Sequence, residues 1–129
     1  FRHLNHGIQI RAPFIWECTR FCLSPHAGTE ARNWAGTLML GGQELGIRFG
    51  LTRALGVYDE RMTRIYRSIG WEPSFIGADG PDRRRICLGL WPFGTAIRDS
   101  IAARAGLDPL TAAPWFEAAF PTAGPAMAA

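Results

Sequence analysis

Segments with strand-like and helix-like spacing of apolar residues alternate along this chain, and that alternation limits the fold more than any other feature. Strand-like runs lie at residues 14–23, 54–58, 71–77 and 86–91. Helix-like runs lie at residues 33–49, 59–69, 94–105 and 109–119. Alternation of this kind is typical of helices packed on a sheet. The sequence therefore predicts the α/β class, with a mixed-sheet α/β/α sandwich.

The composition supports one globular domain. The chain has 129 residues, of which 47% are hydrophobic, and this is enough for a single core. We expect residues 1–120 to form that domain and the Ala/Pro/Gly-rich residues 121–129 to form a flexible tail. The domain is expected to be incomplete at its N-terminus, because the chain begins with Phe1 and not with Met. No apolar run reaches the roughly 18 residues that span a membrane, and no signal peptide is recognised.

Charge and cysteine content exclude several classes of function. All 14 basic residues are Arg, so a Schiff-base lysine and a P-loop lysine are both absent. The net charge of +3 is compatible with an acidic partner or a phosphorylated ligand, but the arginines are too dispersed to indicate nucleic-acid binding. Three cysteines, Cys18, Cys22 and Cys87, favour a reducing, cytoplasmic setting. We expect all three to be small buried apolar residues.

Glycine, proline and aspartate residues mark the expected boundaries. Gly50 and Gly70 are expected to end helices, and Asp59 is a good N-cap for the helix that follows it. Pro73 breaks the strand at 71–77, which should therefore be an edge or bulged strand. The helix at 33–49 contains four glycines, which weaken it or allow close approach to a neighbour; tight packing on the sheet is the expected reason.

The strand at 14–23 carries the main candidates for chemistry. Glu17, Thr19 and Arg20 interrupt an otherwise largely apolar run. Alternation along a strand places Glu17 and Thr19 on one face, so both could act on one ligand, whereas Arg20 points to the opposite face unless a bulge redirects it. A strand that is buried on both faces excludes charged side chains unless they are paired or take part in binding or catalysis. The alternative interpretation is an edge strand with a surface ion pair.

Other kinds of site find little support. The three histidines lie near the start of the chain, and no elbow motif supports a serine hydrolase triad. The His, Cys and carboxylate residues are not clustered as a metal site requires, so we expect no metal. No glycine-rich phosphate motif is present, and the triplet Arg83-Arg84-Arg85 has the character of a solvated loop.

The strand motif and two later segments together resemble the acyl-homoserine lactone synthases, the LuxI-type autoinducer synthases. The strand motif is Ile15-Trp16-Glu17-Cys18-Thr19-Arg20-Phe21, which fits the family's Trp and Glu, then Ser or Thr, Arg and Phe. The second match is Arg67-Ser68-Ile69-Gly70-Trp71, and the third is Cys87-Leu88-Gly89-Leu90-Trp91. The resemblance covers about residues 1–91. It implies a fold similar to the GCN5-related N-acetyltransferases.

The resemblance also implies an activity. Family members transfer an acyl group from acyl carrier protein to the amine of S-adenosylmethionine, close the lactone and release methylthioadenosine; the product is a quorum-sensing signal. Acyl carrier protein and S-adenosylmethionine are therefore both substrates, and the resemblance implies no resident cofactor. Carried onto this chain, Glu17 would take the amine proton, Thr19 would line the cleft, and Arg20 would belong to an electrostatic cluster.

Substrate contacts follow from the same resemblance. Phe1, Trp16, Phe21 and Gly56 are the expected substrate-binding positions. Gly56 falls where family members that prefer 3-oxoacyl chains carry Thr, and a glycine cannot hydrogen-bond a 3-oxo group, so unsubstituted acyl chains are expected. The row Arg61, Arg64 and Arg67 is the expected docking site for acidic acyl carrier protein, with a solvated helix face as the alternative.

The chain departs from the family at its start. The family's N-terminal half supplies an Arg, a Phe, a Trp and two Asp to the adenosylmethionine site, and none of that half is present here. Two other interpretations therefore remain. An ordinary acyl-CoA N-acyltransferase would need an Arg/Gln-x-x-Gly-x-Gly/Ala loop, which we do not find. A non-catalytic remnant would keep the fold without the amine site.

Overall fold

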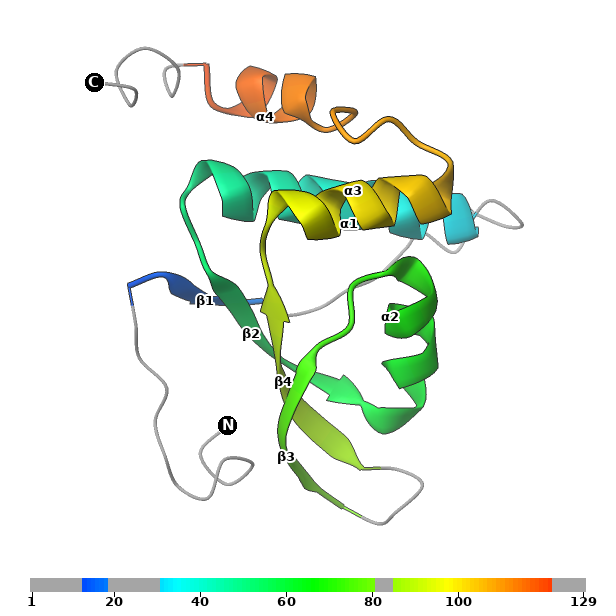
Figure 1. Cartoon of the computed structure of the whole chain (residues 1–129). Coiled ribbons are helices and arrows are strands. Elements are labelled where there is room, and N and C mark those ends of the chain that lie inside the picture. Colours follow the sequence, from blue (N-terminus) through cyan, green and yellow to red (C-terminus); the bar gives the residue numbers. More distant parts are fainter. Residues whose placement is uncertain (1–12, 19–30, 81–84, 122–129) are drawn as a thin grey trace.

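The computed structural model describes residues 13–18, 31–80 and 85–121 of the chain. Within these residues, four strands form one sheet in the order β1-β2-β4-β3 (Figure 1). The strands are β1 (Ile15–Glu17), β2 (Arg53–Asp59), β3 (Ser74–Asp79) and β4 (Ile86–Pro92). β1 is parallel to β2, whereas β2 and β3 are both antiparallel to β4. The mixed sheet that the sequence predicts is therefore confirmed.

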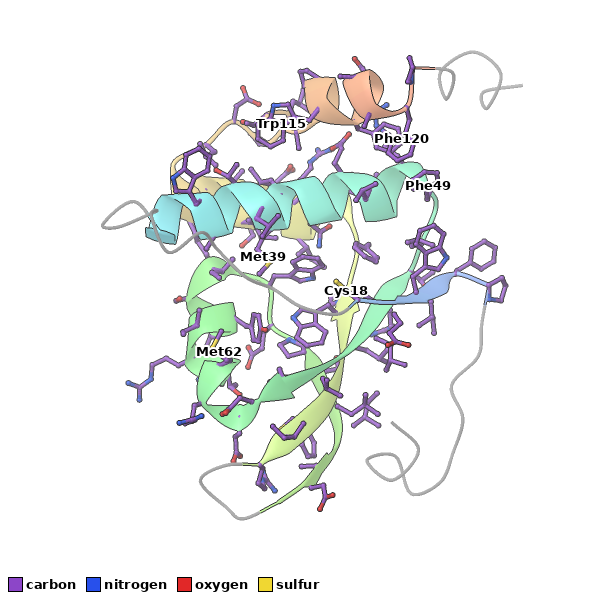
Figure 2. All side chains as sticks on the ribbon, turned by 180° about the vertical axis from the view of Figure 1, so that it is seen from behind. Cys18, Met39, Phe49, Met62, Trp115 and Phe120 are labelled. Carbon is purple, nitrogen blue, oxygen red and sulfur yellow. The ribbon has the colours of Figure 1, made fainter. Side chains whose placement is uncertain are left out.

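The helices are α1 (Ala31–Arg48), α2 (Thr63–Ile69), α3 (Thr95–Ala105) and α4 (Ala113–Ala119), with a 3-10 turn, η3 (Glu60–Met62), before α2. α1 and α3 lie side by side, and α4 lies on the side of α1 that faces away from the sheet (Figures 1 and 2). None of the helices in the described ranges combines the length and the apolar character that a membrane span requires.

The main core lies between the helices and one face of the sheet. Most of its buried residues come from α1, α2, α3 and the two central strands, and they include Leu40, Tyr66, Trp91 and Ile101. On the opposite face, Leu55 and Leu88 form a second, smaller cluster with partly buried residues of the strands. Within the described residues, this second face receives no helix.

Local signals in the sequence explain where several elements end. Gly50 and Gly70 have positive φ angles of 67° and 94° and follow the ends of α1 and α2, as expected. Asp59 is an N-cap, but of η3, because its side chain accepts a hydrogen bond from the Arg61 amide. β3 starts only after Pro73; it is an edge strand with an irregular register between Phe75 and Gly77, which confirms the expected edge strand.

Two expectations are wrong. The helix predicted over 109–119 begins only at Ala113, because Asp108 accepts hydrogen bonds from Leu110 and Thr111 and holds a turn before it. Cys18 is exposed and not buried, because β1 is the edge strand of the described sheet; Cys87 is buried, as expected. Cys22 and the expected tail from residue 122 lie outside the described residues.

Tight packing explains two glycines of α1. A Cβ added at Gly36 would stand 2.7 Å from the Cβ of Ala105 on α3, and one added at Gly46 would collide with the Phe93 ring. The fully buried Gln43 fixes the same helix to the end of β4. Its Nε2 donates to the Pro92 carbonyl at 3.0 Å, and its Oε1 accepts from the Gly94 amide at 3.1 Å.

Candidate active site

The candidate site is built around the short strand β1 at the edge of the described sheet. β1 pairs with β2 over three residues, with Glu17 opposite Leu55. The Cys18 amide then donates a hydrogen bond to the Leu55 carbonyl at 2.8 Å. β2 continues to Asp59 and is paired there with β4. The candidate carboxylate therefore stands beside the point where the described part of β1 ends.

The two faces of β1 have different surroundings, as strand alternation predicts. Ile15 packs against the small cluster of Leu55 and Leu88, so Glu17 also points to the face that lies opposite the helices. Trp16 points to the helix side, where its ring stacks on Phe49 with centroids 5.7 Å apart. Glu17 is exposed and makes no ion pair within the described residues. Its side chain is therefore accessible to solvent.

Part of the expected constellation lies outside the described residues. Thr19, Arg20, Phe1 and Phe21 belong to that part of the chain, so their placement relative to Glu17 stays a prediction. Among the described residues, no group of three or more His, Cys, Asp or Glu could hold a metal ion.

Gly56 lies on the other side of the sheet from Glu17. A Cβ added at Gly56 would stand 2.9 Å from the Cys18 carbonyl oxygen and 3.2 Å from Cζ3 of Trp91. Because Trp91 belongs to the core beneath the helices, Gly56 faces the helix side. The structure therefore places Glu17 and Gly56 on opposite faces of the sheet and does not bring them together.

A cluster of aromatic rings, Tyr58, Tyr66 and Trp91, lies on the helix side next to Gly56. The three ring centroids are 5.3 to 5.8 Å apart in edge-to-face arrangements. Gly56 pairs with Gly89 across β2 and β4, and a Cβ added at Gly89 would stand 2.9 Å from the Tyr58 ring. Burial beside Cys87 raises the pKa of Tyr58 to about 12.

The spacing of residues along the sequence does not by itself point to this aromatic cluster. The signal that could have revealed it is a glycine in the middle of each of two strands, Gly56 and Gly89, since such glycines mark places where another group approaches the backbone closely. Pairing of those two strands was needed to see that the glycines face each other.

The expected docking row is partly neutralised by the chain's own carboxylates. Arg61 donates to both carboxylate oxygens of Asp59, at 2.9 and 2.6 Å, and these bonds lower the pKa of Asp59 to about 2. Arg67 makes an ion pair with Glu72 at 3.0 Å. Arg64 is exposed and makes no ion pair within the described residues. One cation of the row is thus left for an external anion.

Comparison with known proteins identifies the family. No family model matches the sequence. The acyl-homoserine-lactone synthase of Rhizobium etli is 40% identical over 94 residues, which are 70% of this chain and 44% of that protein. The chain thus spans less than half the length of the curated relative that it matches.

Solved structures show the same fold. The CoA-dependent acyl-homoserine lactone synthase MesI has a TM-score of 0.74 at 23% identity, covering 84% of this chain and 55% of its own. BjaI, which is also CoA-dependent and was solved with MTA, has a TM-score of 0.71 at 16% identity, covering 83% of this chain and 51% of its own. TofI in an apo form has a TM-score of 0.60 at 23% identity, covering 84% of this chain and 57% of its own. On the identity to the Rhizobium etli protein, supported by this fold, the chain belongs to the acyl-homoserine lactone synthase family.

Proposed function

We propose that this chain is the part of an acyl-homoserine lactone synthase that carries the catalytic strand. The observation that carries the proposal is the 40% identity to such a synthase over 94 residues. The exposed Glu17 on β1 is in keeping with it. The complete protein would acylate the amine of S-adenosylmethionine and convert the product to a lactone that serves as a quorum-sensing signal.

The proposed reaction has two bond exchanges. The amine nitrogen attacks the carbonyl carbon of an acyl thioester, the C–S bond breaks, and the departing sulfur takes up a proton. Glu17 accepts the proton that the amine loses, directly or through water. The methionine carboxylate oxygen then attacks the γ-carbon, and methylthioadenosine leaves with the electron pair of the second C–S bond.

Glu17 is suited to the role of base by its position. It stands on β1, at the edge of the described sheet, and pairing with β2 fixes the backbone of this strand, so the carboxylate is held by a rigid element and not by a loop. Exposure lets the amine or a water molecule reach it. Thr19 and Arg20 are proposed to bind and orient the substrate from the same segment, and Trp16 and Gly56 from the helix side of the sheet.

The proposed acyl donor is a thioester of either acyl carrier protein or CoA. The arginines of this chain help to decide between these two carriers. An acidic acyl carrier protein would be attracted by the row on η3 and α2, but Arg61 and Arg67 are already ion-paired. Two of the solved proteins with this fold are CoA-dependent. We therefore propose acyl carrier protein as one donor to be tested against acyl-CoA.

The experiment is an assay of the complete protein with S-adenosylmethionine and matched acyl-CoA and acyl-carrier-protein donors. Mass spectrometry should detect an acyl-homoserine lactone and methylthioadenosine in equal amounts. The 129-residue chain should be assayed alongside, since it spans less than half of the curated relative. Acylation of other amines without lactone formation would instead indicate an ordinary N-acyltransferase, and no product from the complete protein would indicate a non-catalytic remnant.

A further inference from the structure

Four aromatic rings connect α4 to the strand that carries Glu17, and we call them the aromatic bridge. Phe49, the residue after α1, is its centre. The Phe49 ring stacks on Trp16 of β1, with centroids 5.7 Å apart and planes inclined by 27°. The same ring meets Phe116 and Phe120 edge-to-face, at 5.5 and 5.3 Å. Figure 2 shows Phe49 at the end of α1, with α4 on one side and β1 on the other.

The aromatic bridge is separate from the core of the molecule. None of its four rings belongs to the main core beneath the helices or to the smaller cluster of Leu55 and Leu88. Phe116 is nevertheless buried, whereas Trp16 and Phe120 are 51% and 38% exposed. Because these contacts add little to the packing of helices on the sheet, their main consequence is to fix the place of Trp16, and with it the place of β1.

The α4 end of the bridge is fastened to α1 by Arg48. Its guanidinium donates to the Glu44 carboxylate at 2.7 Å and to the Glu117 carboxylate at 3.4 Å. It also lies over the Phe116 ring, 5.1 Å from the centroid. Glu44 is buried on α1, so the charge that holds the guanidinium belongs to a fixed part of the molecule. The rings of α4 therefore have a firm base from which to support β1.

We propose that the three phenylalanines of the bridge are positioning residues for the reaction. The hydrogen bonds between β1 and β2 fix the strand within the plane of the sheet, whereas the stack on Phe49 fixes its height on the helix side. Trp16 and Glu17 are consecutive, so a tilt of the strand at Trp16 displaces the carboxylate. A displacement of about 1 Å can cost about 10²-fold in rate. The inference rests on the proposed role of Glu17 as the base.

Kinetics of Phe120→Leu in the complete protein tests the proposal. Loss of the ring should lower kcat for lactone formation about tenfold and leave the KM for S-adenosylmethionine unchanged. Phe120→Tyr keeps the ring and should keep the wild-type kcat. Trp115→Leu is the matched control, because Trp115 is also on α4 and 47% exposed, but makes no ring contact within the described residues (Figure 2). It should be fully active.

Amide hydrogen exchange on the same proteins gives a measurement that does not depend on activity. In Phe120→Leu and in Phe49→Leu, the peptide covering residues 15–18 should exchange several times faster than in wild type, with exchange in β4 unchanged. In Trp115→Leu, neither segment should change.

Three results would overturn the proposal: unchanged exchange at residues 15–18 in both phenylalanine variants, an equal effect of Trp115→Leu, or faster exchange in β4 as well, which would mean a general loss of structure. A fall in activity that comes from KM alone would also overturn it. If the wild type makes no lactone while exchange behaves as expected, the proposed function fails and the support of β1 by the bridge stands.

Discussion

Trp91 lies over Gly56, in the space that a side chain at position 56 would need. A Cβ there would be 3.2 Å from the Trp91 ring and 2.9 Å from the Cys18 carbonyl oxygen, which belongs to the backbone and cannot move aside as a side-chain end can. The glycine is therefore required by the packing of β1, β2 and β4. This is a structural reason for Gly56 that is independent of any preference for the acyl chain.

Gly56→Thr should consequently destabilise the protein. The resemblance alone predicts that the new hydroxyl shifts preference toward 3-oxoacyl donors, by about tenfold at most. With the contacts above, we expect overpacking to lower the free energy of unfolding by about 1–3 kcal/mol, and turnover to fall with every donor. Urea denaturation and the product profile should be measured together.

Gly94→Ala provides the control for that variant, because a Cβ at Gly94 would meet nothing within 4 Å and its φ angle of 166° is extended. It should leave the denaturation midpoint nearly unchanged. A Gly56→Thr protein of normal stability that turns over 3-oxoacyl donors preferentially would show that the packing argument is wrong and the acyl-pocket interpretation right.

Gln43→Leu should destabilise the connection between α1, β4 and α3. Gln43 is fully buried, and its amide is the bridge between the Pro92 carbonyl and the Gly94 amide. Leucine fills the space but leaves the Gly94 amide without that acceptor, which costs about 1–3 kcal/mol. Denaturant unfolding measures this. Glu72→Gln, which breaks an exposed ion pair, should change stability by less than about 1 kcal/mol; equal effects of the two variants would contradict the role of Gln43.

Arg64→Glu tests docking of the acyl carrier protein. Because Arg61 and Arg67 are ion-paired with Asp59 and Glu72, reversal of Arg64 should have the largest effect in the row. We expect a several-fold increase in KM for acyl carrier protein, less change for acyl-CoA, and weaker wild-type binding at higher salt. The KM for S-adenosylmethionine should barely change. If the carrier KM and its salt dependence are both unaffected, the carrier docks elsewhere.

The Asp59–Arg61 pair should be visible in the pH dependence of stability. Hydrogen bonds from Arg61 lower the pKa of Asp59 from 3.8 to about 2. A lowered pKa in the folded state means that the stabilisation is present above the unfolded pKa and is lost as pH falls toward the folded one. Wild type should therefore lose stability relative to Asp59→Asn between about pH 4 and pH 2. Parallel stability curves for the two proteins over that interval would exclude the effect.

Local patterns in the sequence were sufficient for most of the fold, because helices and strands follow from the spacing of nearby residues. α1, β2 and β4 and the terminating glycines Gly50 and Gly70 were predicted within a few residues. The start of α4 was missed because the turn made by Asp108 competes with the helix. Exposure of Cys18 was missed because a sequence does not show which strand lies at the edge.

The site was harder to predict, because its elements depend on contacts between distant parts of the chain. The position of Trp91 over Gly56 requires the register of β2 and β4, and the ion pair of Arg67 with Glu72 requires the turn after α2. Neither is visible in the spacing of residues. The motif strand itself was identified because Glu17 interrupts an apolar run, which is a local signal.

The most direct test of the account is the activity of Glu17→Gln in the complete protein. Loss of the base should reduce lactone formation by about 10²–10⁴-fold, the range typical of lost acid–base catalysis, with the KM for S-adenosylmethionine and the unfolding midpoint little changed. Glu117→Gln, which alters an exposed carboxylate on α4, should remain fully active. A folded Glu17→Gln protein that makes lactone at a near-normal rate would contradict the assignment of Glu17 as the catalytic base.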